Sequence, residues 1–207
     1  MFLGVLLGQA LNVMWRMALV ALATLLWPVL AQAQAPALNE RLLIELPAGW
    51  KVGYTAGEAG RFNTVEYVLE TETIATWTRL LTIQLFYNSA TPMDRYMELM
   101  KANFDQQSPC EGTTFTVMRT RQVYGLDAAI AMLVCPRSKT SGLGELTLIQ
   151  ALRGKDAIYV VQRAMRGPAY TPAAVPIAVT EFQDWLTFMD KLWICDPREA
   201  ARRCPAL

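Results

Sequence analysis

The stretch ELTLIQALRGKDAIYVVQRAMR, residues 145–166, decides the fold class of this chain. It holds two strand-like runs, Glu145–Leu152 and Ala157–Arg166, which are separated by the short polar turn Arg153-Gly154-Lys155-Asp156. Side chains along the second run alternate between two faces, which is the period of a β-strand. Two such runs joined by a tight turn that contains glycine predict an antiparallel hairpin.

Similar runs lie upstream of this hairpin. Thr114–Val123 and Ala128–Cys135 are joined by Tyr124-Gly125-Leu126-Asp127 and predict a second hairpin. Closer to the N-terminus, apolar and alternating patterns predict four more strands, at Leu42–Glu45, Trp50–Tyr54, Phe62–Leu69 and Thr78–Tyr87.

Two segments have helical spacing instead. The first begins near Thr91, a plausible N-cap followed by Pro92, and carries an apolar stripe of Met93, Tyr96, Met97, Met100 and Phe104. The second runs over Thr180–Leu192 with a stripe of Phe182, Trp185, Leu186, Met189 and Trp193. We therefore predict an α+β sandwich in one domain over residues 36–207. It would hold an antiparallel sheet of about six to eight strands with two main helices packed on it, preceded by a signal-peptide helix.

The opening Leu46-Pro47-Ala48-Gly49-Trp50 resembles the first strand of PsbP-type α+β sandwiches. Residues 63–68, 77–82 and 159–164 are similar to stretches of exported bacterial proteins of unknown function. This resemblance implies a small accessory or binding domain. It transfers no catalytic residue, and a shared fold alone does not define a function.

Residues 1–35 have the pattern of a secretory signal. They contain no Asp or Glu and a single basic residue, Arg16, which precedes the apolar run Met17–Leu30. Small residues then predict cleavage after Ala33 or Ala35, and translation from Met14 or Met17 would shorten the leader. The alternative is an uncleaved membrane anchor, although the apolar run of about 14 residues is shorter than the ~20 that span a bilayer. We expect a periplasmic or secreted protein that contacts a membrane only if the signal is retained.

Four cysteines follow the signal: Cys110, Cys135, Cys195 and Cys204. An even number of cysteines in an oxidising compartment predicts disulfides. Of the three connectivities we favour Cys110–Cys135 with Cys195–Cys204, because the second bridge closes a short polar loop near the C-terminus. The spacing does not match a zinc site, so we expect neither a metal nor another cofactor.

The chain has no histidine, which excludes Ser-His-Asp and Cys-His nucleophilic systems. Loss of the leader removes Arg16 and leaves 19 − 1 = 18 basic residues against 18 acidic residues. A formally neutral chain argues against a nucleic-acid partner, which selects a basic surface.

Candidate functional residues fall into three groups. Paired carboxylates could come from Glu66, Glu70, Glu72 and Glu145, but charged side chains are usually solvated. Ser138, Lys139 and Ser141 lie in a polar loop, where a lysine keeps its charge and cannot serve as a base. Aromatic and arginine residues are enriched at recognition surfaces, which makes Trp77, Arg79 and Arg163 a candidate binding surface. Alternatively, these arginines pair with Glu66 or Glu145 across strands.

Three functions follow in order of preference. The first is a non-catalytic exported domain that binds a protein partner in the cell envelope. The second is a carrier of an apolar small molecule or lipid in the gap between the sheet and the methionine-rich helix. The third is a hydrolase that uses carboxylates; the absence of histidine and of any catalytic motif places it last.

Overall fold

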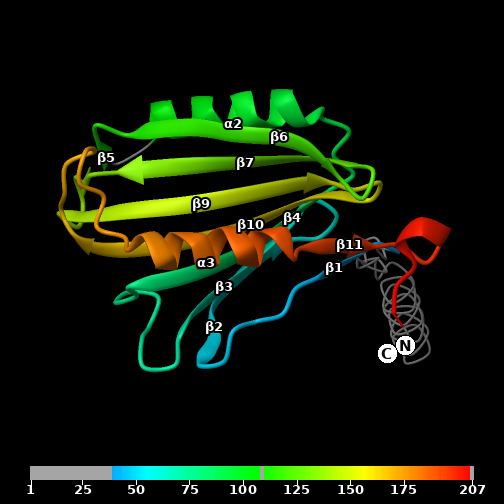
Figure 1. Ribbon diagram of the computed structural model, residues 1–207, viewed down its shortest axis with the longest axis horizontal. Helices are drawn as coiled ribbons and strands as arrows, with labels where there is room; N and C mark the ends of the chain where they lie inside the picture. Colours follow the sequence, from blue (N-terminus) through cyan, green and yellow to red (C-terminus); the bar gives the residue numbers. More distant parts are fainter. Residues whose placement is uncertain (1–38, 108–109, 206–207) are drawn as a thin grey trace, which may run out of the picture. The chain divides into compact units, whose positions relative to one another are not determined.

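Seven antiparallel strands form the central sheet of the computed structural model, in the order β2–β3–β4–β10–β9–β7–β6 (Figure 1). The structure describes residues 39–107 and 110–205, so the predicted signal and its cleavage sites at Ala33 and Ala35 lie outside the described residues. The strands are β2 (Trp50–Glu58), β3 (Phe62–Leu69), β4 (Arg79–Tyr87), β6 (Thr114–Val123), β7 (Leu126–Cys135), β9 (Leu143–Arg153) and β10 (Ala157–Pro168).

Both predicted hairpins are present. β9 pairs with β10 and β6 pairs with β7, in each case across the glycine turn that the sequence indicates. The sheet consists of two meanders, β2–β3–β4 and β6–β7–β9–β10, which are joined where β10 pairs with β4. This junction brings Val161 opposite Ile83, in the middle of the sheet.

One helix covers each face of the sheet. Helix α2 (Met93–Gln107) packs through Met93 and Met97 on the face that carries Ile158 and Val160. Helix α3 (Val179–Asp190) packs on the opposite face through the fully buried Trp185 and Met189, as shown by their contacts with Tyr159 and Val161. Odd and even positions of β10 therefore serve different helices, which is why both of its faces are apolar. The predicted α+β sandwich with two main helices on an antiparallel sheet is confirmed.

Two short sheets lie outside the main one. β1 (Arg41–Leu43) pairs with β11 (Trp193–Cys195), and β5 (Cys110–Glu111) pairs with β8 (Arg137–Ser138). A 3₁₀ turn, η2 (Ala200–Arg202), follows β11. None of the described helices is long and apolar enough to cross a bilayer.

Some boundaries differ from the prediction. The second helix ends at Asp190, and Trp193, which we assigned to its buried stripe, begins β11 and pairs with Leu43. β2 continues through the expected loop to Glu58, and the turn comes only at Gly60, whose positive φ of 75° suits glycine. In both cases strand pairing overrides the local pattern: Trp193 pairs with the distant Leu43, and the end of β2 pairs with the adjacent β3.

The disulfides are Cys110–Cys135 and Cys195–Cys204, which confirms the favoured connectivity. The first bridge ties the short β5 strand that follows α2 to the end of β7. The second closes the chain after β11 into a loop whose ends are nine residues apart in the sequence.

Candidate binding groove

A groove of about 740 Å³ lies between helix α3 and the segment that connects β1 with β2. Its walls are Leu42–Ala48 on one side and Asp184, Thr187, Phe188, Lys191 and Leu192 on the other. Its volume is in the range of ligand sites in proteins.

The first wall is an extended segment with free backbone groups. Beyond the β1 pair Leu43–Trp193, the chain leaves its short sheet and runs toward β2. Among the described residues, Glu45, Leu46 and Ala48 form no backbone hydrogen bond, and Leu46 is exposed. Such a segment has N–H and C=O groups that another extended chain can use.

The second wall is the outer side of α3. Thr187, Phe188 and Lys191 lie three, four and seven residues after Asp184, so the four share one side of the helix and its C-terminal end. Asp184, Thr187 and Lys191 are exposed, whereas Phe188 is half-buried and also packs against the core.

Ion pairs hold α3 in place at both ends. The Arg79 guanidinium donates to both oxygens of Glu181, with Nε 2.6 Å and Nη2 2.9 Å away. Near the other end, Arg121 Nη2 lies 2.6 Å from Asp190 Oδ1. Because these arginines come from β4 and β6, α3 crosses the face from one meander to the other.

Arg163 of β10 contacts the same helix from the side of the sheet. Its guanidinium lies 5.5 Å from the Trp185 ring centre and 5.0 Å from that of Phe188, which is cation–π geometry. Burial lowers the pKa of Arg163, and the nearby carboxylates of Glu181 and Asp184 oppose that effect. Arg163 thus helps to position Phe188 as part of the groove wall.

The candidate surface of Trp77, Arg79 and Arg163 is not one patch. Trp77 is buried on the α2 side of the sheet, where it packs against Val68 and lies under the Arg166 guanidinium at 4.3 Å. The alternative that Arg79 and Arg163 pair with Glu66 or Glu145 is wrong as well. Both glutamates project from the α2 side, and the partner of Arg79 is Glu181 on the helix that covers the other face.

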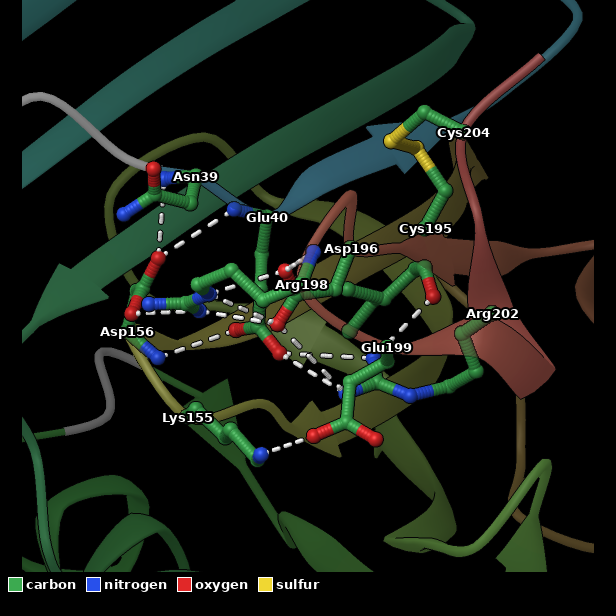
Figure 2. A network of polar contacts seen from close by, with 11 residues as sticks. Asn39, Glu40, Lys155, Asp156, Cys195, Asp196, Arg198, Glu199, Arg202 and Cys204 are labelled. Carbon is green, nitrogen blue, oxygen red and sulfur yellow. Dashed lines mark hydrogen bonds and ion pairs between the residues drawn. A yellow bond between two sulfur atoms is a disulfide. The ribbon is translucent and has the colours of Figure 1, made fainter.

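A buried network of charges anchors the first wall (Figure 2). Glu40, directly before β1, accepts from Arg202 Nη2 at 3.2 Å, and Arg202 Nη1 also donates to the Ile194 carbonyl at 3.2 Å. Glu40 and Arg202 are almost fully buried, as is Asp196, which lies 3.9 Å from Arg202. A side chain at position 154 would collide with the Glu40 carboxylate, so this position of the β9–β10 turn requires glycine.

Asp156 and Arg198 complete this network. Asp156 Oδ2 accepts from the backbone N–H groups of Asn39 and Glu40, and Arg198 donates to Asp156 and Asp196. The Arg198 hydrogen bond lowers the pKa of Asp196. Burial alone would raise the pKa of Asp156, but its hydrogen bonds from Glu40, Arg198 and Asn39 outweigh burial and lower it. The network and the Cys195–Cys204 bridge therefore hold β1, and with it the groove wall, beside β11.

The carboxylates considered for catalysis do not converge. Burial raises the pKa of Glu66, and it also raises that of Glu145 although Arg166 opposes it. Glu66 lies opposite Thr82, which lies opposite Gln162, whereas Glu145 lies opposite Arg166. Glu66 and Glu145 are three strands apart across the sheet and four residues apart along it. The two carboxylates are therefore separated by roughly 19 Å, which is too far for one acid–base pair.

The other candidates have structural roles. Glu72 accepts from the hydroxyl and the backbone N–H of Thr78. The buried Ser138 Oγ accepts from the backbone N–H groups of Thr140 and Ser141, while Lys139 is exposed. Within residues 39–107 and 110–205, no three Cys, Asp or Glu side chains are arranged to hold a metal ion.

Sequence reasoning missed the groove but identified one end of its wall. The Leu46–Trp50 motif, which we read as a strand entry, includes three groove residues, Leu46, Pro47 and Ala48. The outer side of α3 has no distinctive pattern, and only its position opposite this segment makes it a wall.

No family model matches this chain, and no curated protein matches it. Solved structures with a similar backbone include a Pseudomonas aeruginosa protein of unknown function described as a putative regulator. It is 16% identical, with 73% of this chain and 94% of that chain covered and a TM-score of 0.41. A point mutant of the protein Mog1 is 8% identical, with coverage of 73% and 85% and a TM-score of 0.40. LpqN, involved in cell envelope biogenesis of Mycobacterium tuberculosis, is 8% identical, with coverage of 75% and 83% and a TM-score of 0.36. At these TM-scores the similarities carry no information about what the present chain does.

Proposed function

We propose that this protein is an exported, non-catalytic binding domain that holds an extended segment of a protein partner in the groove beside α3. The observation that carries this proposal is the unpaired backbone of Glu45, Leu46 and Ala48, which form part of one wall of an open groove. Addition of a strand to such an edge is a common mode of peptide recognition, in which main-chain hydrogen bonds supply affinity.

The opposite wall suits the side chains of such a segment. Phe188 offers an apolar contact, and Thr187 is exposed beside it. Arg79, Arg121 and Arg163 hold α3 against the sheet, so binding would not have to order this wall first. A preformed wall lowers the entropic cost of association.

Export is supported by the two disulfides and by the leader of the sequence. Disulfides persist in oxidising compartments, which for this chain would be the periplasm or the exterior. The relationship to PsbP-type sandwiches belongs to the same proposal and rests on the Leu46–Trp50 motif together with the α+β architecture.

The proposal is tested with the processed protein purified from the envelope fraction and panned against a random peptide display library. Peptides that use the groove should lose about tenfold in affinity when Thr187→Trp fills it. The matched control is Gln183→Trp, on the same helix but outside the groove lining, which should bind as the unmodified protein does. Selected peptides that bind both variants equally would refute the proposal.

A second candidate function, carriage of an apolar small molecule, rests on a trough of about 520 Å³ beside α2. Its lining has no charged residue and consists of Gln84, Phe86, Ser89, Thr91, Tyr96, Leu99, Met100, Asn103, Phe104 and Gln162. Met93 and Met97 fill the space under the helix, so a ligand would lie at its side, above the hydrogen bond from Gln162 to Gln84. Native mass spectrometry would show a bound lipid that Leu99→Arg displaces; a protein of unmodified mass would count against this function.

A further inference from the structure

The extended wall of the groove runs antiparallel to α3. β1 pairs with β11 in antiparallel register, and β11 follows α3 almost directly. The chain therefore leaves Leu43 beside the C-terminal end of α3 and runs back toward its N-terminal half. Figure 1 shows the segment between β1 and β2 running back along α3, the other wall of the groove.

Charge is distributed unevenly along the groove. Glu45 on the extended wall and Lys191, directly after the C-terminal end of α3, have opposite charges. Toward the other end Asp184 is the charged lining residue, and no described residue forms an ion pair with it. Arg163 is close enough to sense Asp184, but its guanidinium lies under the helix on the Trp185 and Phe188 rings. The groove as a whole has a net charge of −1, from Glu45, Asp184 and Lys191.

We infer that the groove selects an extended segment with an apolar residue over Phe188 and a basic residue over Asp184. This inference rests on the proposed function and names the kind of partner that the same site accepts. A basic side chain complements the unpaired carboxylate, and an aliphatic or aromatic side chain buries the open side of Phe188. An acidic residue at the Asp184 end would be repelled.

The geometry also defines the spacing of these two residues. Asp184 and Phe188 are four positions apart, which is about 6 Å along a helix axis. Two residues on the same side of an extended strand are about 6.7 Å apart. A bound segment that runs along α3 can therefore place an apolar residue over Phe188 and a basic residue over Asp184 when these two residues are two positions apart in its sequence.

The inference is tested with the peptides selected above, measured by fluorescence anisotropy at low and high salt. Asp184→Asn should weaken binding about tenfold, and Asp184→Lys should reverse the preference from basic to acidic peptides at that position. The matched control is Gln183→Lys, which changes the net charge by +1, as Asp184→Asn does, but lies outside the groove lining. Affinity for this control should stay within about twofold of the unmodified protein.

Different outcomes would contradict the predicted peptide preference and the proposed binding function. Peptides that Thr187→Trp blocks but that have no basic residue two positions from an apolar one would overturn the inference and leave the groove as a binding site. Equal weakening by Asp184→Asn and Gln183→Lys would also overturn it, because the effect would then be one of net charge. Peptides unaffected by Thr187→Trp would overturn the proposed function itself.

Discussion

The Arg202 guanidinium lies 3.2 Å from the Glu40 carboxylate although 162 residues separate them in the chain, and both side chains are almost fully buried. This pair joins the residue that precedes β1 to the turn that follows β11. It is the long-range contact that holds the two short strands, and therefore the groove wall, together.

Replacement of Arg202 should strongly destabilise the protein. Arg202→Met leaves Glu40 unpaired and removes a neighbour of Asp196, so the free energy of unfolding should fall by about 3 kcal/mol in urea titrations. The exposed Arg203 provides the control, because Arg203→Met should cost less than about 0.5 kcal/mol. Equal losses would mean that the buried pair has no special role.

Stability should decline in acid. Hydrogen bonds lower the pKa of Asp156 and Asp196 in the folded protein below the ordinary value of 3.8. The unfolded chain then takes up protons first, so stability is fully present above pH 3.8 and is lost as pH falls through the folded values. Urea titrations at a series of acidic pH values measure this loss. Asp156→Asn should be less stable at neutral pH and should show a smaller decline in acid; an unchanged pH slope would contradict this explanation.

Glu66 should have the opposite dependence. Burial raises the pKa of Glu66 above 4.5, so the folded state favours the protonated form. The protein therefore loses stability as the pH rises from 4.5 through the raised pKa of the folded state. Glu66→Gln should therefore raise the free energy of unfolding at pH 7, by less than about 1 kcal/mol because the site is only half-buried. The gain should vanish near pH 3, where the unmodified side chain is already neutral. A gain independent of pH would point to packing instead.

The ion pair between Arg79 and Glu181 should stabilise α3 measurably. It is bidentate, and each side chain is about 30% exposed. A double-mutant cycle with Arg79→Met and Glu181→Gln should give a coupling energy of about 1 kcal/mol. The exposed pair Arg61–Glu58 should give less than about 0.5 kcal/mol in the same assay. Similar coupling energies for the two pairs would contradict the claim that the Arg79–Glu181 pair holds α3 in place.

The two disulfides should contribute differently to stability and to peptide binding. Cys110–Cys135 closes 25 residues and Cys195–Cys204 closes nine, so replacement of the first pair by alanine should cost about 1 kcal/mol more in unfolding free energy. Replacement of the second pair should cost less overall but should weaken peptide binding in the groove, because it frees the loop that anchors β1. Peptide binding that responds equally to both replacements would contradict this division.

Much of this architecture can be predicted from the sequence because its causes are local. The alternation of Ile158, Val160 and Ala164 with Tyr159, Val161 and Met165 assigns each side chain of β10 to a face, and glycine turns define both hairpins. The even number of cysteines predicts disulfides, and the short polar loop after Cys195 favours, among three connectivities, the pairing that the structure has.

Only the tertiary structure decided which faces meet which partners. The pairing of β10 with β4 joins residues 70 to 86 positions apart, and no local pattern specifies such a partner. Arg79 and Trp77 are two residues apart in the chain but lie on opposite sides of the sheet, because Trp77 precedes β4 and is not bound by the alternation of the strand, which begins at Arg79. The groove exists because the chain after β1 passes along the outer side of α3. That path depends on the buried contact between Arg202 and Glu40, which forms only when the two ends of the described chain come together.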